Sequence, residues 1–161
     1  MKDMKEKLRV LEAEPCFATL EPHCLRLLAS CTAEFEVEEG GYLVREHEPA
    51  SAFYLLQEGS VALEAHPAGQ APVVLLTLGP GAFVGWSWLL PPYRGCFDAR
   101  ALTAVKSLRF DAEALRQGMD RHPVCGYALL KHFTALIVQR LQATRLQGLD
   151  IYADGDPAHV P

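Results

Sequence analysis

The segment with the most distinctive chemistry runs from Gly79 to Ala101 and reads GPGAFVGWSWLLPPYRGCFDARA. A glycine turn precedes a brief apolar strand, and Gly85 then marks a point where the backbone approaches its neighbours closely. A short helix is expected to begin there, with Arg94 nearby. Because helix N-terminal amides and a guanidinium together bind anions, the pattern predicts a binding segment. The alternative is that Arg94 is a solvated surface residue.

Catalysis is not indicated by the remaining reactive residues. The six histidines show no HxH or HExxH spacing, and no GxSxG, P-loop or Cys–His signature occurs. A cupin-type metal enzyme, which is the alternative for a small β-barrel, would need several ligands from paired strand motifs that are missing here. We therefore predict a protein that is not an enzyme, with no catalytic residues, no metal site and no cofactor.

We expect Cys16, Cys24 and Cys31 to be buried. The five cysteines are odd in number, irregularly spaced and without a CxxC pair, so we expect free thiols in a reducing compartment. They are Cys16, Cys24, Cys31, Cys96 and Cys125.

The charge and hydropathy of the chain exclude some classes of partner. The formal net charge is −5, and the 15 Lys and Arg residues are scattered rather than gathered in a basic stripe, so no nucleic-acid partner is expected. No stretch approaches the ~18 apolar residues of a membrane span, and the charged N-terminus lacks the apolar core of a signal peptide. These features predict a cytoplasmic protein whose partner is a small-molecule ligand or another protein.

The elements that would position the binding segment are mainly strands. Helices are expected over 3–12 and 22–30, followed by short strand-like runs about every ten residues, a pattern typical of a sandwich or barrel. The expected strands begin at Thr32 and cover 42–44, 52–56, 60–65, 72–78, 83–84, 98–104 and 106–110. One domain is predicted, with a helical segment 1–31, a β-barrel 32–110, helices over 111–151 and a tail 152–161.

The C-terminal helix carries an unusually long apolar stripe. Asp111 is expected to cap a short helix over 111–119, and Pro123 begins a longer one that runs to about Ile151. Its apolar positions lie mostly three and four residues apart, so the start of the stripe can cover the barrel and a later part can face a second copy. We therefore expect a homodimer through this helix. The residues expected in the contact are Leu130, Phe133, Ile137 and Leu141.

Three stretches together resemble a known family. FYLLQEGSVALE, then LGPGAFVG, then ARALTAVKSLRFD are similar in order and spacing to the cyclic-nucleotide-binding domain shared by catabolite activator proteins, kinase regulatory subunits and gated channels. The resemblance implies an eight-stranded β-roll of jelly-roll type (a double-stranded β-helix) with flanking helices, in which 79–101 holds the phosphate-binding cassette. It also implies a stand-alone sensor or adaptor, since no helix-turn-helix module follows the long helix.

The cassette departs from the family pattern at two positions. Trp86 stands where the family has the glutamate that grips the ribose hydroxyl, and an indole accepts no hydrogen bond. The phosphate arginine falls on Gly95, with Arg94 one position early and Cys96 at the hydroxyl position. The candidate ligand-binding residues are Phe83, Val84, Gly85, Trp86, Ser87, Trp88, Arg94, Gly95 and Cys96.

Three hypotheses for the function follow. The first is a sensor with an atypical pocket that binds a protein partner or a small molecule other than cyclic AMP, and a planar ligand could stack on Trp86, Trp88 and Tyr93. The second is a genuine cyclic-nucleotide sensor that uses Arg94. The third is a structural or regulatory subunit whose pocket is filled by the same aromatic side chains.

Overall fold

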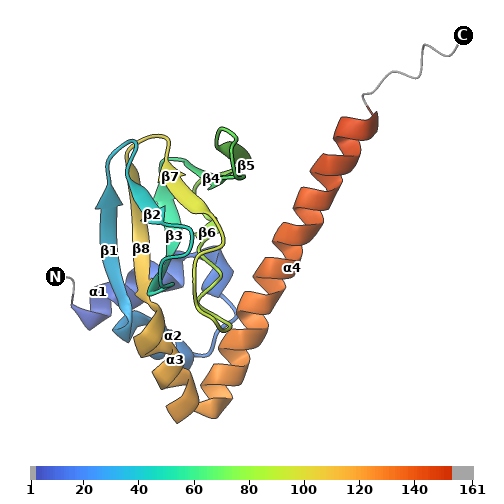
Figure 1. Ribbon diagram of the computed structural model, residues 1–161. Helices are drawn as coiled ribbons and strands as arrows, with labels where there is room; N and C mark the ends of the chain where they lie inside the picture. The colour runs from blue at the N-terminus through green and yellow to red at the C-terminus, as the bar shows by residue number, and fades with distance from the viewer. Residues whose placement is uncertain (1–2, 154–161) are drawn as a thin grey trace, which may run out of the picture.

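The computed structural model describes residues 3–153, with side chains as far as residue 145. Within this range eight strands form two antiparallel sheets of four, flanked by helices (Figure 1). The sheets have the strand orders β1-β8-β3-β6 and β2-β7-β4-β5. This architecture confirms the predicted β-roll. The strands are β1 (Thr32–Val37), β2 (Tyr42–Val44), β3 (Ala52–Glu58), β4 (Val61–Ala65), β5 (Val73–Leu78), β6 (Phe83–Val84), β7 (Asp98–Ala101) and β8 (Val105–Asp111).

The four helices predicted before and after the strands are present, with a short 3-10 turn in addition. They are α1 (Met4–Ala13), η1 (Pro15–Phe17), α2 (Pro22–Ser30), α3 (Ala112–Arg121) and α4 (Pro123–Ala153). Asp111 caps α3 as expected, because its Oδ1 accepts a hydrogen bond of 2.9 Å from the Ala114 amide. The first two residues of the expected tail are helical, and 154–161 lie outside the described residues. Among the helices described, none has both the length and the apolar character needed to cross a bilayer.

The strand β3 lies between two hydrophobic cores, which explains why its sequence is apolar without alternation. Its Phe53 and Leu55 face a core built with the helices, whereas Tyr54 and Leu56 face the interior of the β-roll. All four of these side chains are buried. The sheet β1-β8-β3-β6 therefore separates the helical core from the roll core.

The helix α4 begins under the roll and then leaves it. Its first turn packs closely on α3, since a Cβ at Gly126 would lie 2.7 Å from the Met119 carbonyl oxygen. One turn later Leu129 and Phe133 are fully buried in the helical core. The C-terminal half of α4 passes β6 and extends away from both sheets (Figure 1).

The expectation that all the cysteines are free was wrong for two of them. Cys24 on α2 and Cys125 on α4 form a disulfide, while Cys16, Cys31 and Cys96 are free. The two bonded residues are separated by 101 positions in the sequence. Their pairing depends on the packing of α2 against α4, which spacing along the chain does not reveal.

Candidate functional site

The glycine turn and β6 place the start of the cassette beside β3. The amide of Gly81 donates to the Leu56 carbonyl at 2.8 Å, and the Leu56 amide donates to Ala82 at 3.0 Å. Gly85 then adopts a φ of +88°, a left-handed conformation that favours glycine, and a Cβ there would approach Val44 Cγ2 to 3.2 Å. The predicted close approach of the backbone at Gly85 is therefore present.

After Gly85 the chain makes two successive turns and not a helix. The Leu89 amide donates to the Trp86 carbonyl at 3.2 Å, but no helix is assigned between β6 and β7. The prediction that a helix begins here, with N-terminal amides that bind an anion, was therefore wrong. The two prolines at 91 and 92 follow at once, and proline lacks the N–H that a continuing helix requires.

Both tryptophans of the cassette face the helical core and not the interior of the roll. Trp88 is fully buried and stacks on Phe53, with ring centroids 4.3 Å apart and planes 6° from parallel. Trp86 is half-buried and packs against Phe83 and Phe133, at centroid distances of 5.5 and 6.1 Å. Trp86 therefore replaces the family glutamate without filling the roll with its indole.

The second half of the cassette pairs with the loop that follows β2. Gly95 is hydrogen-bonded on both sides, because its amide donates to Glu48 O at 2.9 Å and its carbonyl accepts from His47 N at 2.8 Å. A Cβ on Gly95 would lie only 2.3 Å from the Arg45 carbonyl oxygen. No side chain fits at position 95, where the resemblance implies a phosphate arginine, unless the backbone moves.

Arg94, Ser87 and Cys96 meet at the exposed rim of this segment. The Arg94 guanidinium donates to the His47 carbonyl at 2.9 Å, which holds the side chain over the neighbouring loop. Ser87 Oγ lies 3.7 Å from Cys96 Sγ. The structure thus brings Ser87, Cys96 and the Arg94 backbone close together at this rim, whereas the side chain of Trp88 is fully buried.

A small cavity adjoins the cassette glycines. Val44 lines it and also lies within 3.2 Å of the positions that a Cβ would take at Gly85 and at Gly95. Ala52 and Tyr54 line the same cavity, whose volume is about 150 Å³. Small-molecule sites have volumes of roughly 300–1,000 Å³, so this space is too small for a nucleotide as it stands.

Two helix arginines that the sequence analysis missed hold the cassette from the other side. Arg116 on α3 donates to the Trp88 carbonyl at 2.8 Å, and its guanidinium lies 4.1 Å from the centre of the Tyr93 ring. Arg140 on α4 donates to the Phe83 carbonyl at 2.7 Å, and burial lowers its pKa. A signal for Arg140 was present in the sequence, because it lies seven residues after Phe133 on the apolar stripe of α4.

Besides Nε2 of His132, three buried donor groups of the cassette and of α4 have no hydrogen-bond partner among the described residues. They are Nη2 of Arg140 and the Nε1 atoms of Trp86 and Trp88. Two of these three side chains contact Phe83. Arg140 donates a hydrogen bond to the Phe83 carbonyl, and the indole of Trp86 packs against the Phe83 ring. An unsatisfied buried donor costs about 1–3 kcal/mol, so this is where an acceptor oxygen would be favourable.

The outer face of the second sheet carries a buried ion pair. Glu64 on β4 accepts hydrogen bonds from Nε and Nη2 of Arg100 on β7, and the Glu64 side chain is 6% exposed. These bonds hold the pKa of the Glu64 carboxyl below its usual value and raise that of Arg100. The guanidinium of Arg100 is therefore already engaged by a carboxylate.

The residues expected in a helix–helix contact divide into two groups. Phe133 is 0% exposed and packs edge-on against Phe53 and Trp88, so it belongs to the core of its own chain. Leu130 and Leu141 are exposed, and Ile137 is half-buried. The part of the stripe that faces away from the roll therefore excludes Phe133.

The chain is similar in sequence and in fold to known proteins. The family described as cyclic nucleotide-binding domain matches residues 34–122, which is more than half of the chain. A cyclic-AMP-activated global transcriptional regulator from Mycobacterium tuberculosis, similar to the catabolite activator, is 22% identical over 94% of this chain. The chain spans 66% of the length of this relative.

Solved structures share the fold. A protein from Geobacter metallireducens, described as a candidate cyclic nucleotide-binding protein, has a TM-score of 0.72 and 28% identity, covering 88% of this chain and 99% of that one. The sensor domain of the transcriptional regulator DNR from Pseudomonas aeruginosa has a TM-score of 0.66 and 21% identity, covering 88% of this chain and 95% of that one. The similarity to the DNR sensor domain, at 21% identity, shows a shared fold alone.

Proposed function

Because the chain belongs to the cyclic nucleotide-binding domain family, we propose that it is a regulatory sensor domain whose altered site does not hold cyclic AMP in the usual way. The observation that carries this proposal is Gly95, where the Arg45 carbonyl occupies the space of any side chain. The arginine next to it, Arg94, is bonded to a carbonyl at the rim. The protein acts by binding and not by catalysis.

The unpartnered donors of Arg140 and Trp86 favour a small molecule with acceptor oxygens as the ligand. A ligand there would contact both the cassette and α4, since Arg140 already joins α4 to the Phe83 carbonyl. Binding would then change the position of α4, which is the part of the described chain that extends furthest from the roll (Figure 1). The response would pass through α4 to a second copy or a partner protein.

Calorimetric titration with cyclic AMP and cyclic GMP tests the proposal. We expect no saturable heat from either nucleotide with the wild type or with Arg94→Ala. Tight one-to-one binding that is lost in Arg94→Ala, but kept in a control variant of the exposed Arg9, would refute the proposal and establish the second hypothesis, a genuine cyclic-nucleotide sensor. Arg9 is a suitable control because it lies on α1.

A filled, purely structural site is the other candidate, and the cavity of about 150 Å³ beside the cassette favours it. Mass spectrometry of gently denatured protein distinguishes a sensor domain from a purely structural subunit. A bound metabolite that is absent from Arg140→Leu supports the sensor. Protein that carries no small molecule, and whose thermal stability no metabolite mixture changes, supports the structural subunit.

We also propose that the protein is a homodimer through α4. Leu130, Val138 and Leu141 are exposed apolar side chains on this helix. Light scattering at tens of micromolar should give the mass of two chains, and Leu141→Glu should shift it towards one. A wild-type monomer at that concentration would contradict the dimer.

A further inference from the structure

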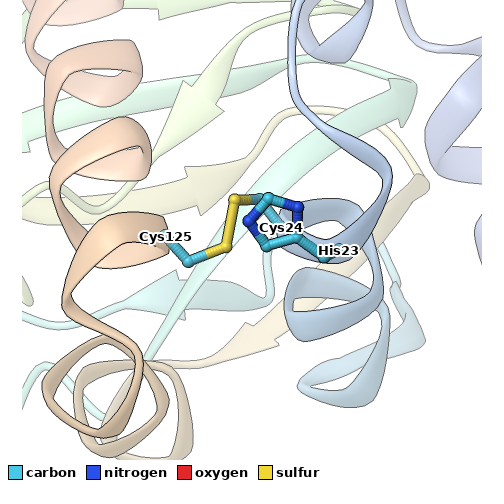
Figure 2. Close-up of side chains that lie close together, drawn as sticks. All are labelled: His23, Cys24 and Cys125. Carbon is cyan, nitrogen blue, oxygen red and sulfur yellow. A yellow bond between two sulfur atoms is a disulfide. The ribbon is translucent and has the colours of Figure 1, made fainter.

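Two cysteines and a histidine meet where α2 contacts the first turn of α4. The Sγ atoms of Cys24 and Cys125 and a ring nitrogen of His23 all lie within 4.8 Å of one another. Figure 2 shows the imidazole beside the disulfide. A disulfide needs no imidazole, whereas two thiolates and an imidazole together form a ligand set. Among the described residues, this is the one group of three such side chains that lie so close together.

We propose that, when the disulfide is reduced, Cys24, Cys125 and His23 bind a zinc ion. Zinc is bound tetrahedrally, with Zn–S distances of about 2.3 Å, so two thiolates on one ion lie about 3.8 Å apart. The Cα atoms of the two cysteines are 5.4 Å apart, so rotation of the side chains can provide this separation. Thiolate ligands favour zinc over magnesium or calcium, which prefer oxygen.

A cavity next to the three side chains provides access and the fourth position. It has a volume of about 550 Å³ and is lined by His23 and Cys125 together with His122, Arg26 and Arg121. Zinc sites with three protein ligands complete their coordination with water, and His122 is a further imidazole in the same cavity. Cationic side chains close to cysteines favour the thiolates that zinc needs.

The disulfide and the zinc site are two alternative states of the same residues. A dithiol reductant supplies two electrons and two protons, which convert the disulfide into two thiols, and the reductant becomes its own disulfide. Zinc binding then releases the two thiol protons, because thiolates are the ligands. Since both sulfurs are used in either state, zinc and the disulfide exclude each other.

The test uses the full chain reduced with a phosphine, freed of metal, and titrated with zinc against a chromophoric chelator. We expect one equivalent to bind, and cobalt in its place should show thiolate-to-metal charge-transfer absorption. Cys24→Ser should weaken binding at least 100-fold and His23→Gln at least tenfold. The matched controls Cys31→Ser and Cys96→Ser replace free cysteines and should leave the affinity unchanged.

Two outcomes would overturn the proposal. The first is reduced wild type that binds no zinc, or binds it with no thiolate absorption for cobalt. The second is oxidised wild type, with its disulfide intact, that binds zinc as tightly as the reduced protein does. Both comparisons use the wild-type chain, so they hold even if a cysteine variant fails to fold. Neither outcome bears on the proposed ligand at the cassette, because His23 and Cys24 lie on α2.

Discussion

Replacing Gly95 with alanine perturbs the cassette at the point that distinguishes it from the family. The new Cβ would lie 2.3 Å from the Arg45 carbonyl oxygen, and the two segments are hydrogen-bonded to each other on both sides of the contact. Because the obstacle is backbone, no rotation of a side chain can relieve it. The loop after β2 and the cassette must move apart.

The expected loss of stability is about 3 kcal/mol. Extra volume in a closely packed site costs ~1–3 kcal/mol. The separation also weakens the bonds from Gly95 N to Glu48 O and from His47 N to Gly95 O, which are 2.9 and 2.8 Å long and contribute ~0.5–1.5 kcal/mol each. At roughly 2–4 °C per kcal/mol for a chain of this size, Tm should fall by about 6–12 °C.

Urea denaturation followed by tryptophan fluorescence, together with thermal melting by circular dichroism, measures this loss. Gly79→Ala is the matched control, because a Cβ at Gly79 meets nothing within 4 Å and its φ is not left-handed. We expect that control to lie within about 1 kcal/mol of the wild type. If Gly95→Ala is as stable as Gly79→Ala, the steric account of the missing arginine is wrong.

Three further predictions concern other parts of the structure. Trp88→Ala should cost about 3–5 kcal/mol in urea unfolding, because Trp88 is a buried core residue, whereas a surface stacking residue would cost little. The pKa of Glu64 is lowered from 4.5 by Arg100, so the stability that their bond contributes is present above pH 4.5 and is lost as the pH falls through the folded-state pKa. In urea midpoints measured across that range, the advantage of the wild type over Glu64→Gln should therefore shrink on acidification, and a constant difference would contradict this. Burial raises the pKa of Cys16 to about 11, so iodoacetamide at pH 8 should label exposed Cys96 well before Cys16, and equal labelling rates would contradict this.

Most of the fold could be predicted from local patterns. The strand expected from Thr32 is β1, and the three- and four-residue spacing after Pro123 predicted α4. The 3-10 turn Pro15–Phe17 was missed, because three residues are too few to carry a periodic signal. The helix expected after Gly85 was wrong because the two prolines interrupt it, and the segment forms separate turns.

The candidate site was predicted less well. The resemblance implied a cassette over 79–101 whose arginine is missing, which stays a prediction, and Trp86 and Trp88 were expected either to stack on a ligand or to fill its pocket. Which face of a strand or loop points to which core depends on the packing of the whole sheet. The contacts of Arg116 and Arg140 with the cassette were missed for the same reason, since each joins residues that are distant in the sequence.

The sequence by itself determined the strand and helix pattern and the glycine turn before β6, because these depend on neighbouring residues and on steric preferences of single residues. Only the tertiary structure decided where the tryptophans point, what a side chain at position 95 would meet and which cysteines pair. Cys24 and Cys125 come from helices 101 positions apart, and that distance is closed by core packing between α2 and α4. Side chains separated so widely acquire a shared chemistry only when the chain has folded.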